Sequence, residues 1–160
     1  MTLIKPLLLT LLAAASWGAQ AKYNGEDRGK PVMPAVANAK LQTECGGCHM
    51  AFPAGLLPAA SWRQVMSGLD KHFGTDASLP AADTTEITNY LVKYASNRWT
   101  ATTTPLRISE AQWFKTKHGA GEVNPAVWKR ESVKSPANCM ACHSGADKGD
   151  FNERNIRIPK

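Results

Sequence analysis

Several features that would assign a protein class are missing from this 160-residue sequence. No apolar run reaches the length of about 20 residues that a membrane-spanning helix needs. The 19 basic residues exceed the 13 acidic ones, but they are scattered, and the tightest basic groups are Lys115-Thr-Lys117 and Lys129-Arg130. A nucleic-acid-binding protein usually shows a denser basic stripe, so we expect no nucleic-acid partner. Glycine (12) and proline (10) are near average usage, which excludes a collagen-like or low-complexity chain.

The first 21 residues have the pattern of a secretory signal peptide. A single positive charge at Lys5 precedes the run from Leu7 to Ala15, which is apolar apart from Thr10. Ala19-Gln20-Ala21 then matches the small-x-small cleavage pattern. The alternative, a membrane anchor, needs a longer apolar run. We therefore expect cleavage after Ala21, a mature chain of residues 22–160 that does not span the membrane and, in a bacterium, a periplasmic location.

All four cysteines of the chain lie in two C-x-x-C-H motifs. The motifs are Cys45-Gly-Gly-Cys48-His49 and Cys139-Met-Ala-Cys142-His143, and this pattern is the attachment signature of a c-type haem. Two thiols three residues apart on a helical turn can add to the two vinyl groups of one haem, and the following histidine lies on the same face. Its imidazole can then bind the iron as the proximal ligand. We therefore predict two covalently bound haem c groups, the first carried by a helix that begins near Ala39.

Three other kinds of site also use paired cysteines. A four-cysteine zinc site accepts two C-x-x-C pairs, but the gap of about 90 residues between them is wide for a zinc ribbon. Structural disulfides are common in exported chains, and a thioredoxin-like redox motif needs a surrounding βαβ pattern, which is not seen. None of these requires a histidine after each pair. With four histidines in 160 residues, a histidine would follow both pairs by chance about once in 1,600 sequences, which favours haem attachment.

The first candidate for a second axial ligand is His72. Ser61 is a suitable cap for a helix that begins at Trp62, and apolar residues recur at helical spacing as far as Phe73. His72 borders this apolar stripe, and Gly74 follows at a natural helix end. In a haem protein, such a histidine points toward the haem pocket. In the plainer interpretation, it only satisfies the last carbonyl groups of the helix.

The second candidate is His118. Ser109 and Gln112 can form a capping box for a helix that ends at Gly119. Phe114 and His118 are four residues apart and share one face of this helix. A surface or helix-end role is again the plainer alternative. If both candidates bind iron, the four histidines of the chain supply two axial pairs with none left over.

Methionine is the rival sixth ligand of a haem iron. The mature chain has four methionines: Met33, Met50, Met66 and Met140. Met50 adjoins one C-x-x-C-H motif and Met140 lies inside the other, so both are poorly placed to reach the far side of the haem. Met66 lies on the apolar stripe, where filling the core is the ordinary role. Met33 is the candidate with the most freedom.

Four histidines can pair in two ways. Local pairing joins His49 to His72 and His118 to His143, whereas crossed pairing joins His49 to His118 and His72 to His143. Loop-closure entropy favours the shorter local loops by only about 2 kcal/mol. The segment from Pro80 to Pro105 would hold a complete helix and a Thr-rich hinge, which suits a divider between two haem-bearing halves. We therefore expect local pairing.

The sequence predicts a mainly α fold in which short helices and long loops wrap around two haems. Asp83 and Glu86 have the spacing of a further capping box, at the start of a helix near Thr84. Convincing strand alternation is not seen. We expect a first haem-binding half over residues 22–104 and a second over residues 105–160. The haems would replace much of the hydrophobic core, which suits a small chain that otherwise buries little surface.

These motifs resemble the small bacterial dihaem cytochrome c family. The matching runs are Glu44–Met50, Leu56–Trp62, Gly68–Gly74 and Ala77–Leu79 in the first half, and Trp113–His118, Ala137–His143 and Gly145–Phe151 in the second. The resemblance covers nearly the whole mature chain. It implies electron transfer by two bis-histidine haems, with His72 and His118 as distal ligands. It also implies as partners a small oxygen-binding monohaem c-type cytochrome (the sphaeroides haem protein) and, upstream, a membrane b-type cytochrome.

Axial ligation decides between the possible functions. A haem with histidine on both sides has no open position for oxygen, peroxide or nitrite, but it can change oxidation state with little rearrangement. We therefore predict a periplasmic electron-transfer protein and not an enzyme. The alternative is a haem enzyme or a gas-binding protein in which a small molecule displaces one distal histidine. Binding of cyanide or carbon monoxide would distinguish the two functions.

Overall fold

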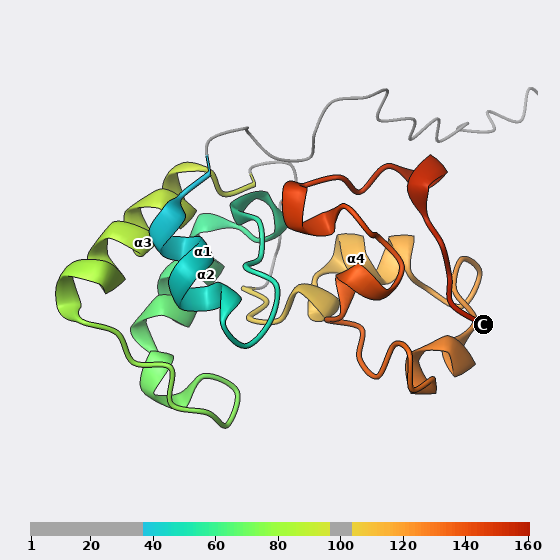
Figure 1. The fold of residues 1–160 in the computed structure, drawn as a ribbon. Coiled ribbons are helices and arrows are strands. Elements are labelled where there is room, and N and C mark those ends of the chain that lie inside the picture. Colours follow the sequence, from blue (N-terminus) through green and yellow to red (C-terminus); the bar gives the residue numbers. More distant parts are fainter. Residues whose placement is uncertain (1–36, 97–103) are drawn as a thin grey trace, which may run out of the picture.

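The computed structural model describes residues 37–96 and 104–160. The predicted signal peptide, Met33 and most of the Thr-rich hinge lie outside these ranges. The described residues form two groups of short helices, blue to green and yellow to red, on opposite sides of Figure 1. They contain no β-strand, and their isolated bridge joins His72 to Thr75. The predicted fold, mainly α with short helices and long loops, is confirmed.

The first group contains three α-helices that share one core. These are α1 (Ala39–Gly46), α2 (Ala59–Ser67) and α3 (Ala81–Lys93), with the 3₁₀ helices η1 (Ala54–Leu56) and η2 (Leu69–Lys71) between them. α3 packs against both α2 and α1 (Figure 1). Their apolar faces enclose a cluster of buried side chains: Leu41, Ala51, Ala54, Leu57, Trp62, Met66, Ile87 and Leu91.

The second group consists mostly of single turns. Among the described residues 104–160, the only α-helix is α4 (Gln112–Lys117). The 3₁₀ helices around it are η3 (Ile108–Glu110), η4 (Pro125–Lys129), η5 (Cys139–Ala141), η6 (Ala146–Lys148) and η7 (Glu153–Asn155). Apart from Phe114, the buried apolar residues of this group are small: Ala111, Val127, Val133 and Ala146. So short a segment buries little surface by itself, which suits a fold completed by a bound group.

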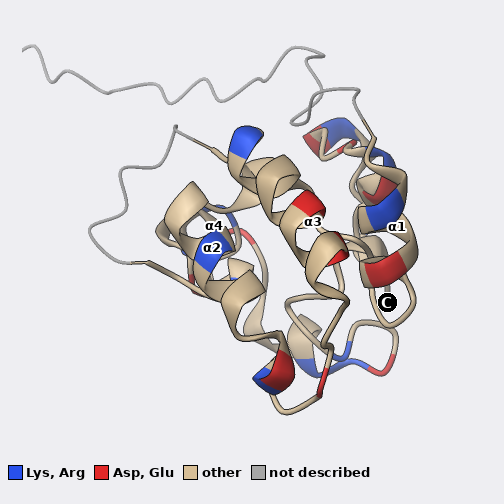
Figure 2. Cartoon of the chain, turned by 90° about the vertical axis from the view of Figure 1, so that its left-hand side faces the viewer, with Lys and Arg blue, Asp and Glu red and all other residues tan. Residues whose placement is uncertain are grey.

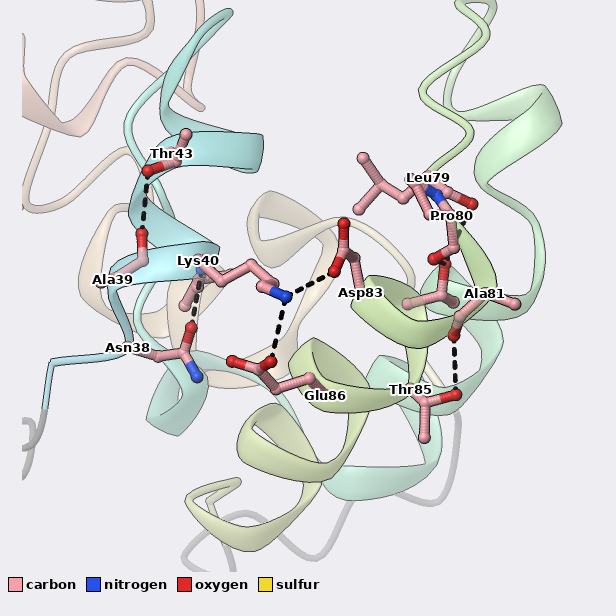
Figure 3. A network of polar contacts seen from close by, with 12 residues as sticks. Asn38, Ala39, Lys40, Thr43, Leu79, Pro80, Ala81, Asp83, Thr85 and Glu86 are labelled. Carbon is pink, nitrogen blue, oxygen red and sulfur yellow. Dashed lines mark hydrogen bonds and ion pairs between the residues drawn. The ribbon is translucent and has the colours of Figure 1, made fainter.

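A polar network joins α1 to α3 (Figure 3). Lys40 on α1 bonds Asp83, and its Nζ lies 3.1 Å from Glu86 Oε2. Donating hydrogen bonds to these two carboxylates raises the pKa of Lys40. The prediction that Asp83 and Glu86 form a capping box is therefore wrong. α3 begins at Ala81, directly after Pro80, whose fixed φ suits the start of a helix, so Asp83 already lies in the first turn.

The other two capping predictions are also wrong. α2 begins after Pro58, so Ser61 lies inside the helix, where its hydroxyl is buried without a hydrogen-bond partner. Ser109 lies in η3, which ends with a bond of 3.1 Å from the backbone N–H of Ala111 to the carbonyl of Ile108. The chain therefore enters α4 only at Gln112. In both places the backbone starts a helical turn before the residue that could have capped it.

The described helices are short. The longest, α3, has 13 residues, and no helix in the described ranges is long and apolar enough to cross a membrane. Basic and acidic residues are interspersed along the ribbon in Figure 2 and do not gather into one stripe in that view. Charged residues that are scattered along the sequence are therefore also scattered over this side of the fold.

Candidate functional site

The structure places each C-x-x-C-H histidine beside one of the two remaining histidines. The ring centroids of His49 and His72 are 6.2 Å apart, with an angle of 24° between the rings. Those of His118 and His143 are 6.1 Å apart, with an angle of 65°. The spatial pairing is therefore the local one.

This spacing matches two imidazoles bound on opposite sides of one metal ion. A bond from an imidazole nitrogen to a metal ion such as zinc is about 2.0–2.1 Å long. The nitrogen itself lies about 1.1 Å from the centroid of its ring. Two imidazoles on opposite sides of one metal ion therefore have ring centroids about 6.2–6.4 Å apart. Both observed distances are close to this value. The residues present therefore fit a haem that takes one imidazole on each face of its iron.

The first motif spans the end of α1 and the turn that follows. α1 ends at Gly46, so the prediction that one helix carries the whole motif is wrong. Two successive glycines, which have low helix propensity, stand where the helix would have to continue. Cys45 is half-buried in the last turn of α1, whereas Cys48 and His49 are exposed. The turn thus presents one thiol and the imidazole outside the helical core.

The His49 ring is held by two neighbours. Its Nδ1 lies 2.7 Å from the carbonyl oxygen of Met50, and its ring stacks on Phe52 with a centroid distance of 4.8 Å. A carbonyl accepts a hydrogen bond only from a protonated nitrogen, so the proton is on Nδ1 and Nε2 is left to bind a metal. This arrangement is the usual outer support of a histidine ligand.

His72 lies at the end of η2 and not at the end of one continuous helix. The predicted helix from Trp62 to Phe73 is interrupted because α2 ends at Ser67 and Gly68 separates it from η2. Burial lowers the pKa of His72, and the nearby His49 and Arg107 lower it further. The neutral imidazole, which these surroundings favour, is the form that binds a metal.

His118 lies directly after α4, where the sequence predicts the end of that helix. Its ring is parallel to that of Phe114, with centroids 4.0 Å apart and an angle of 8°. Its Nδ1 is 3.2 Å from the Phe114 carbonyl oxygen, so it also satisfies one of the last carbonyl groups of the helix. This bond leaves Nε2 free, so the helix-end role and a ligand role are compatible. Burial lowers the pKa of His118.

The second motif follows a tight turn. Cys139 begins η5, and the backbone N–H of His143 donates to the Cys139 carbonyl over 2.8 Å. The C-terminal segment contacts this turn, because the backbone N–H of Arg157 donates to the Cys142 carbonyl over 3.0 Å. Burial raises the pKa of the Cys139 thiol to about 11 and lowers that of His143. The His143 ring packs 5.4 Å from that of Phe151.

The arrangement of the thiols does not match the other sites that use paired cysteines. The four cysteines form no disulfide with one another. A zinc site needs a cluster of ligands, but no three His, Cys, Asp or Glu side chains gather into one within residues 37–96 and 104–160. Each thiol pair instead belongs to a motif whose histidine faces a second imidazole.

The two motifs open on the same cavity. Its volume is about 360 Å³, and its lining combines residues of both motifs with the loop between η4 and η5: Cys48, His49, Met50, Ser135, Ala137, Asn138, Cys139 and Met140. No local pattern predicts which side chains meet there, because this part of the wall comes from the packing of two distant segments. Groups attached to the two motifs therefore lie near one another.

Comparison with known proteins agrees with this geometry. The sequence model of the dihaem cytochrome c family matches residues 41–151. The chain belongs to this family. It is similar to a solved diheme cytochrome c from Rhodobacter sphaeroides, with 46% identity and a TM-score of 0.67 over 73% of this chain and 98% of that one. A diheme cytochrome c from Shewanella baltica OS155 is similar too, with 38% identity and a TM-score of 0.68 over 79% and 95% of the two chains. No match was found among curated protein sequences.

Family membership identifies the cofactor. This dihaem cytochrome c carries two covalently bound haem c groups, as the two motifs predict, and it is an electron-transfer protein. The resemblance to the family is thereby confirmed. The boundary between halves at residues 104 and 105 stays a prediction, since Thr104 is the first described residue after the gap.

Proposed function

We propose that this dihaem cytochrome c transfers electrons in the periplasm through two haems that each have two histidine ligands. Each haem is attached by the two thiols of one motif and bound by the imidazole pair that this motif helps to form. The first site consists of Cys45, Cys48, His49 and His72, and the second of Cys139, Cys142, His118 and His143. The observation that carries the proposal is the spacing of the two imidazole pairs, 6.2 and 6.1 Å.

Two histidines per haem favour electron transfer over chemistry at the iron. With both axial positions filled, a substrate or gas would have to displace an imidazole before it could bind. The hydrogen bonds of His49 and His118 and the aromatic rings stacked on them hold these ligands in place. Little therefore has to move when the oxidation state changes. Histidine in place of methionine also favours the ferric state, because Met/His ligation raises the reduction potential.

The shared cavity supports exchange of electrons within the protein. Cys48 and Cys139, one attachment residue of each motif, both line it. The two haems, each bonded to one of these cysteines, would therefore be held close together. An electron that enters at one haem can thus leave from the other, so the protein acts as a relay with two contact points.

Location and partners follow from other observations. The signal-peptide pattern of the first 21 residues supports export to the periplasm. The resemblance to the family supports a small oxygen-binding monohaem c-type cytochrome as one redox partner and a membrane b-type cytochrome as another. Rapid mixing of the reduced protein with an oxidised monohaem cytochrome of this kind tests the first partner. Electron transfer no faster than to an unrelated c-type cytochrome would contradict it.

Spectroscopy of the purified periplasmic protein tests the ligation. We expect two low-spin haems in both oxidation states and no methionine–iron charge-transfer band. Carbon monoxide at a concentration that saturates a five-coordinate ferrous haem should leave both haems of the reduced protein unchanged. A complex with carbon monoxide or cyanide at one haem would instead support the enzyme or gas-binding alternative. Intact mass should equal residues 22–160 plus two haems, and any other N-terminus would contradict cleavage after Ala21.

A further inference from the structure

The turn that follows His72 contains a strained phenylalanine. The backbone N–H of Thr75 donates to the His72 carbonyl over 3.0 Å, and the two residues between them, Phe73 and Gly74, have φ of 49° and 99°. Two successive positive φ values are typical of a type I′ turn, for which Asn-Gly is the favoured pair. Glycine adopts this conformation freely, whereas a bulky side chain does so at a cost in stability. A bulky residue at this position therefore points to a role for its side chain.

That side chain lies between His72 and an arginine of the second helical group. The rings of Phe73 and His72 meet edge to face, with centroids 4.8 Å apart at 62°. The guanidinium carbon of Arg107 lies over the Phe73 ring, 4.0 Å from its centroid. Arg107 in turn has its Nε 3.8 Å from Glu110 Oε1. A continuous series of contacts thus leads from the start of η3 to the imidazole of His72.

We propose that Arg107 and Phe73 form a clasp that positions the His72 ring. This Arg107–Phe73 clasp rests on the proposed function, because it assumes that His72 is an axial ligand of the first haem. The rings of His49 and His118 are oriented by hydrogen bonds from Nδ1 to a carbonyl. The His72 ring is instead oriented by its edge-to-face contact with Phe73, and the Phe73 ring is in turn covered by Arg107. The second helical group therefore supports a ligand of the haem attached to the first.

Phe73 does not act as a core residue. The residue is 45% exposed, and it is not among the residues packed into the core of the first group. Removing its ring opens no internal cavity, so the loss of the clasp can be separated from a loss of folding. Its attraction to Arg107 is a cation–π contact, which depends on both the ring and the positive charge.

The decisive variant is Phe73→Asn, because it produces the favoured Asn-Gly turn while removing the ring. We expect the midpoint of thermal unfolding to stay the same or rise. Displacement of one distal ligand by carbon monoxide in the reduced protein should nevertheless become about tenfold more favourable, since both the aromatic and the cation–π contact are lost. Arg107→Gln should show about a fivefold change, and Arg107→Lys, which keeps the charge but not the planar group, should fall between Arg107→Gln and wild type. Arg63→Gln, at an exposed arginine of α2, is the matched control.

Three results would overturn the clasp. The first is wild-type binding of carbon monoxide in both Phe73→Asn and Arg107→Gln. The second is an equal change at both haems, which would mean general loosening. The third is an added effect of Phe73→Asn in a protein that already carries His72→Ala, since the clasp acts only through that ring. A wild-type spectrum without a bis-histidine first haem contradicts the proposed function instead, and it is seen before any variant is compared.

Discussion

The indole nitrogen of Trp113 donates a hydrogen bond to the main-chain carbonyl of Leu56 over 3.1 Å. Trp113 belongs to α4 in the second helical group, and Leu56 is the last residue of η1 in the first. Ile108 of η3 also packs against the core of the first group. The two groups are therefore joined by side-chain contacts as well as by the chain.

Replacing Trp113 with phenylalanine should weaken this connection. Leu56 is buried, so its carbonyl would lose a hydrogen bond in a place that water reaches poorly. We expect the free energy of unfolding to fall by about 1 kcal/mol. Denaturant unfolding followed by circular dichroism measures this loss. Trp128→Phe, at a half-buried tryptophan of the same group that packs against Phe114 and His118, compares the loss of another indole. Wild-type stability of Trp113→Phe would show that the Leu56 bond is unimportant.

Replacing Ser61 with alanine should have the opposite effect. The Ser61 side chain is fully buried, and its hydroxyl has no hydrogen-bond partner. Burial of an unpaired hydroxyl is unfavourable, so we expect Ser61→Ala to be neutral or to raise the free energy of unfolding by up to about 1 kcal/mol. Ser67→Ala on the same helix removes an exposed hydroxyl that bonds the Gln64 carbonyl over 3.0 Å, and it is the control for the gain in helix propensity that a Ser→Ala change brings. Clear destabilisation by Ser61→Ala would contradict an unpaired hydroxyl.

The chemistry of the site could be predicted from the sequence because covalent attachment imposes a fixed local spacing. Each cysteine pair and its histidine lie within five successive residues, so no knowledge of the fold is needed to recognise them. The environment of Met66 could also be predicted, since its place on an apolar stripe determines that it is buried. His72 and His118 could be named as candidates because no other histidine remained.

The helix starts could not be predicted from capping patterns. Ser61 and Asp83 are good capping residues, but each is preceded by a proline at which the helix begins earlier. Asp83 then serves a tertiary contact with Lys40, which no local pattern reveals. The contact of Arg107 with Phe73 was missed for the same reason. The positive φ of Phe73 leaves no trace in the sequence apart from the glycine that follows.

Asp76 should make the stability of the protein depend on pH in the acidic range. Hydrogen bonds from Ser78 lower the pKa of Asp76 below its ordinary value of 3.8, and the Ser78 N–H lies 2.9 Å from Asp76 Oδ1. Because the folded state has the lower pKa, the stabilisation is fully present above pH 3.8 and is lost as the pH falls through the pKa of the folded protein. Asp76→Asn should therefore reduce stability slightly near neutral pH but not at the lowest pH.

Thermal unfolding of wild type and Asp76→Asn between neutral pH and pH 3 measures this difference. The two midpoints should converge as the pH decreases. Asp147→Asn, which removes a negative charge from an exposed residue of η6, controls for the change in net charge. A constant gap between wild type and Asp76→Asn across the whole range would rule out a contribution from the carboxylate charge.

The pairing of the histidines predicts which haem each variant affects. Since His72 lies beside His49, and His118 beside His143, His72→Ala should leave the first haem five-coordinate and the second unchanged. The reduced variant should then bind about one carbon monoxide per protein, because only one iron has an open position. His118→Ala should bind the same amount at the other haem.

A background with a single haem makes this test decisive. Cys45→Ala combined with Cys48→Ala removes attachment of the first haem, and intact mass confirms that one haem remains. In this background His72→Ala should leave the remaining haem low-spin, because local pairing gives that haem no contact with His72. His118→Ala in the same background is the positive control, and it should produce a high-spin haem that binds carbon monoxide. If His72→Ala instead produced the high-spin haem and His118→Ala did not, the crossed pairing would be correct and the arrangement of the four imidazoles described above would be wrong.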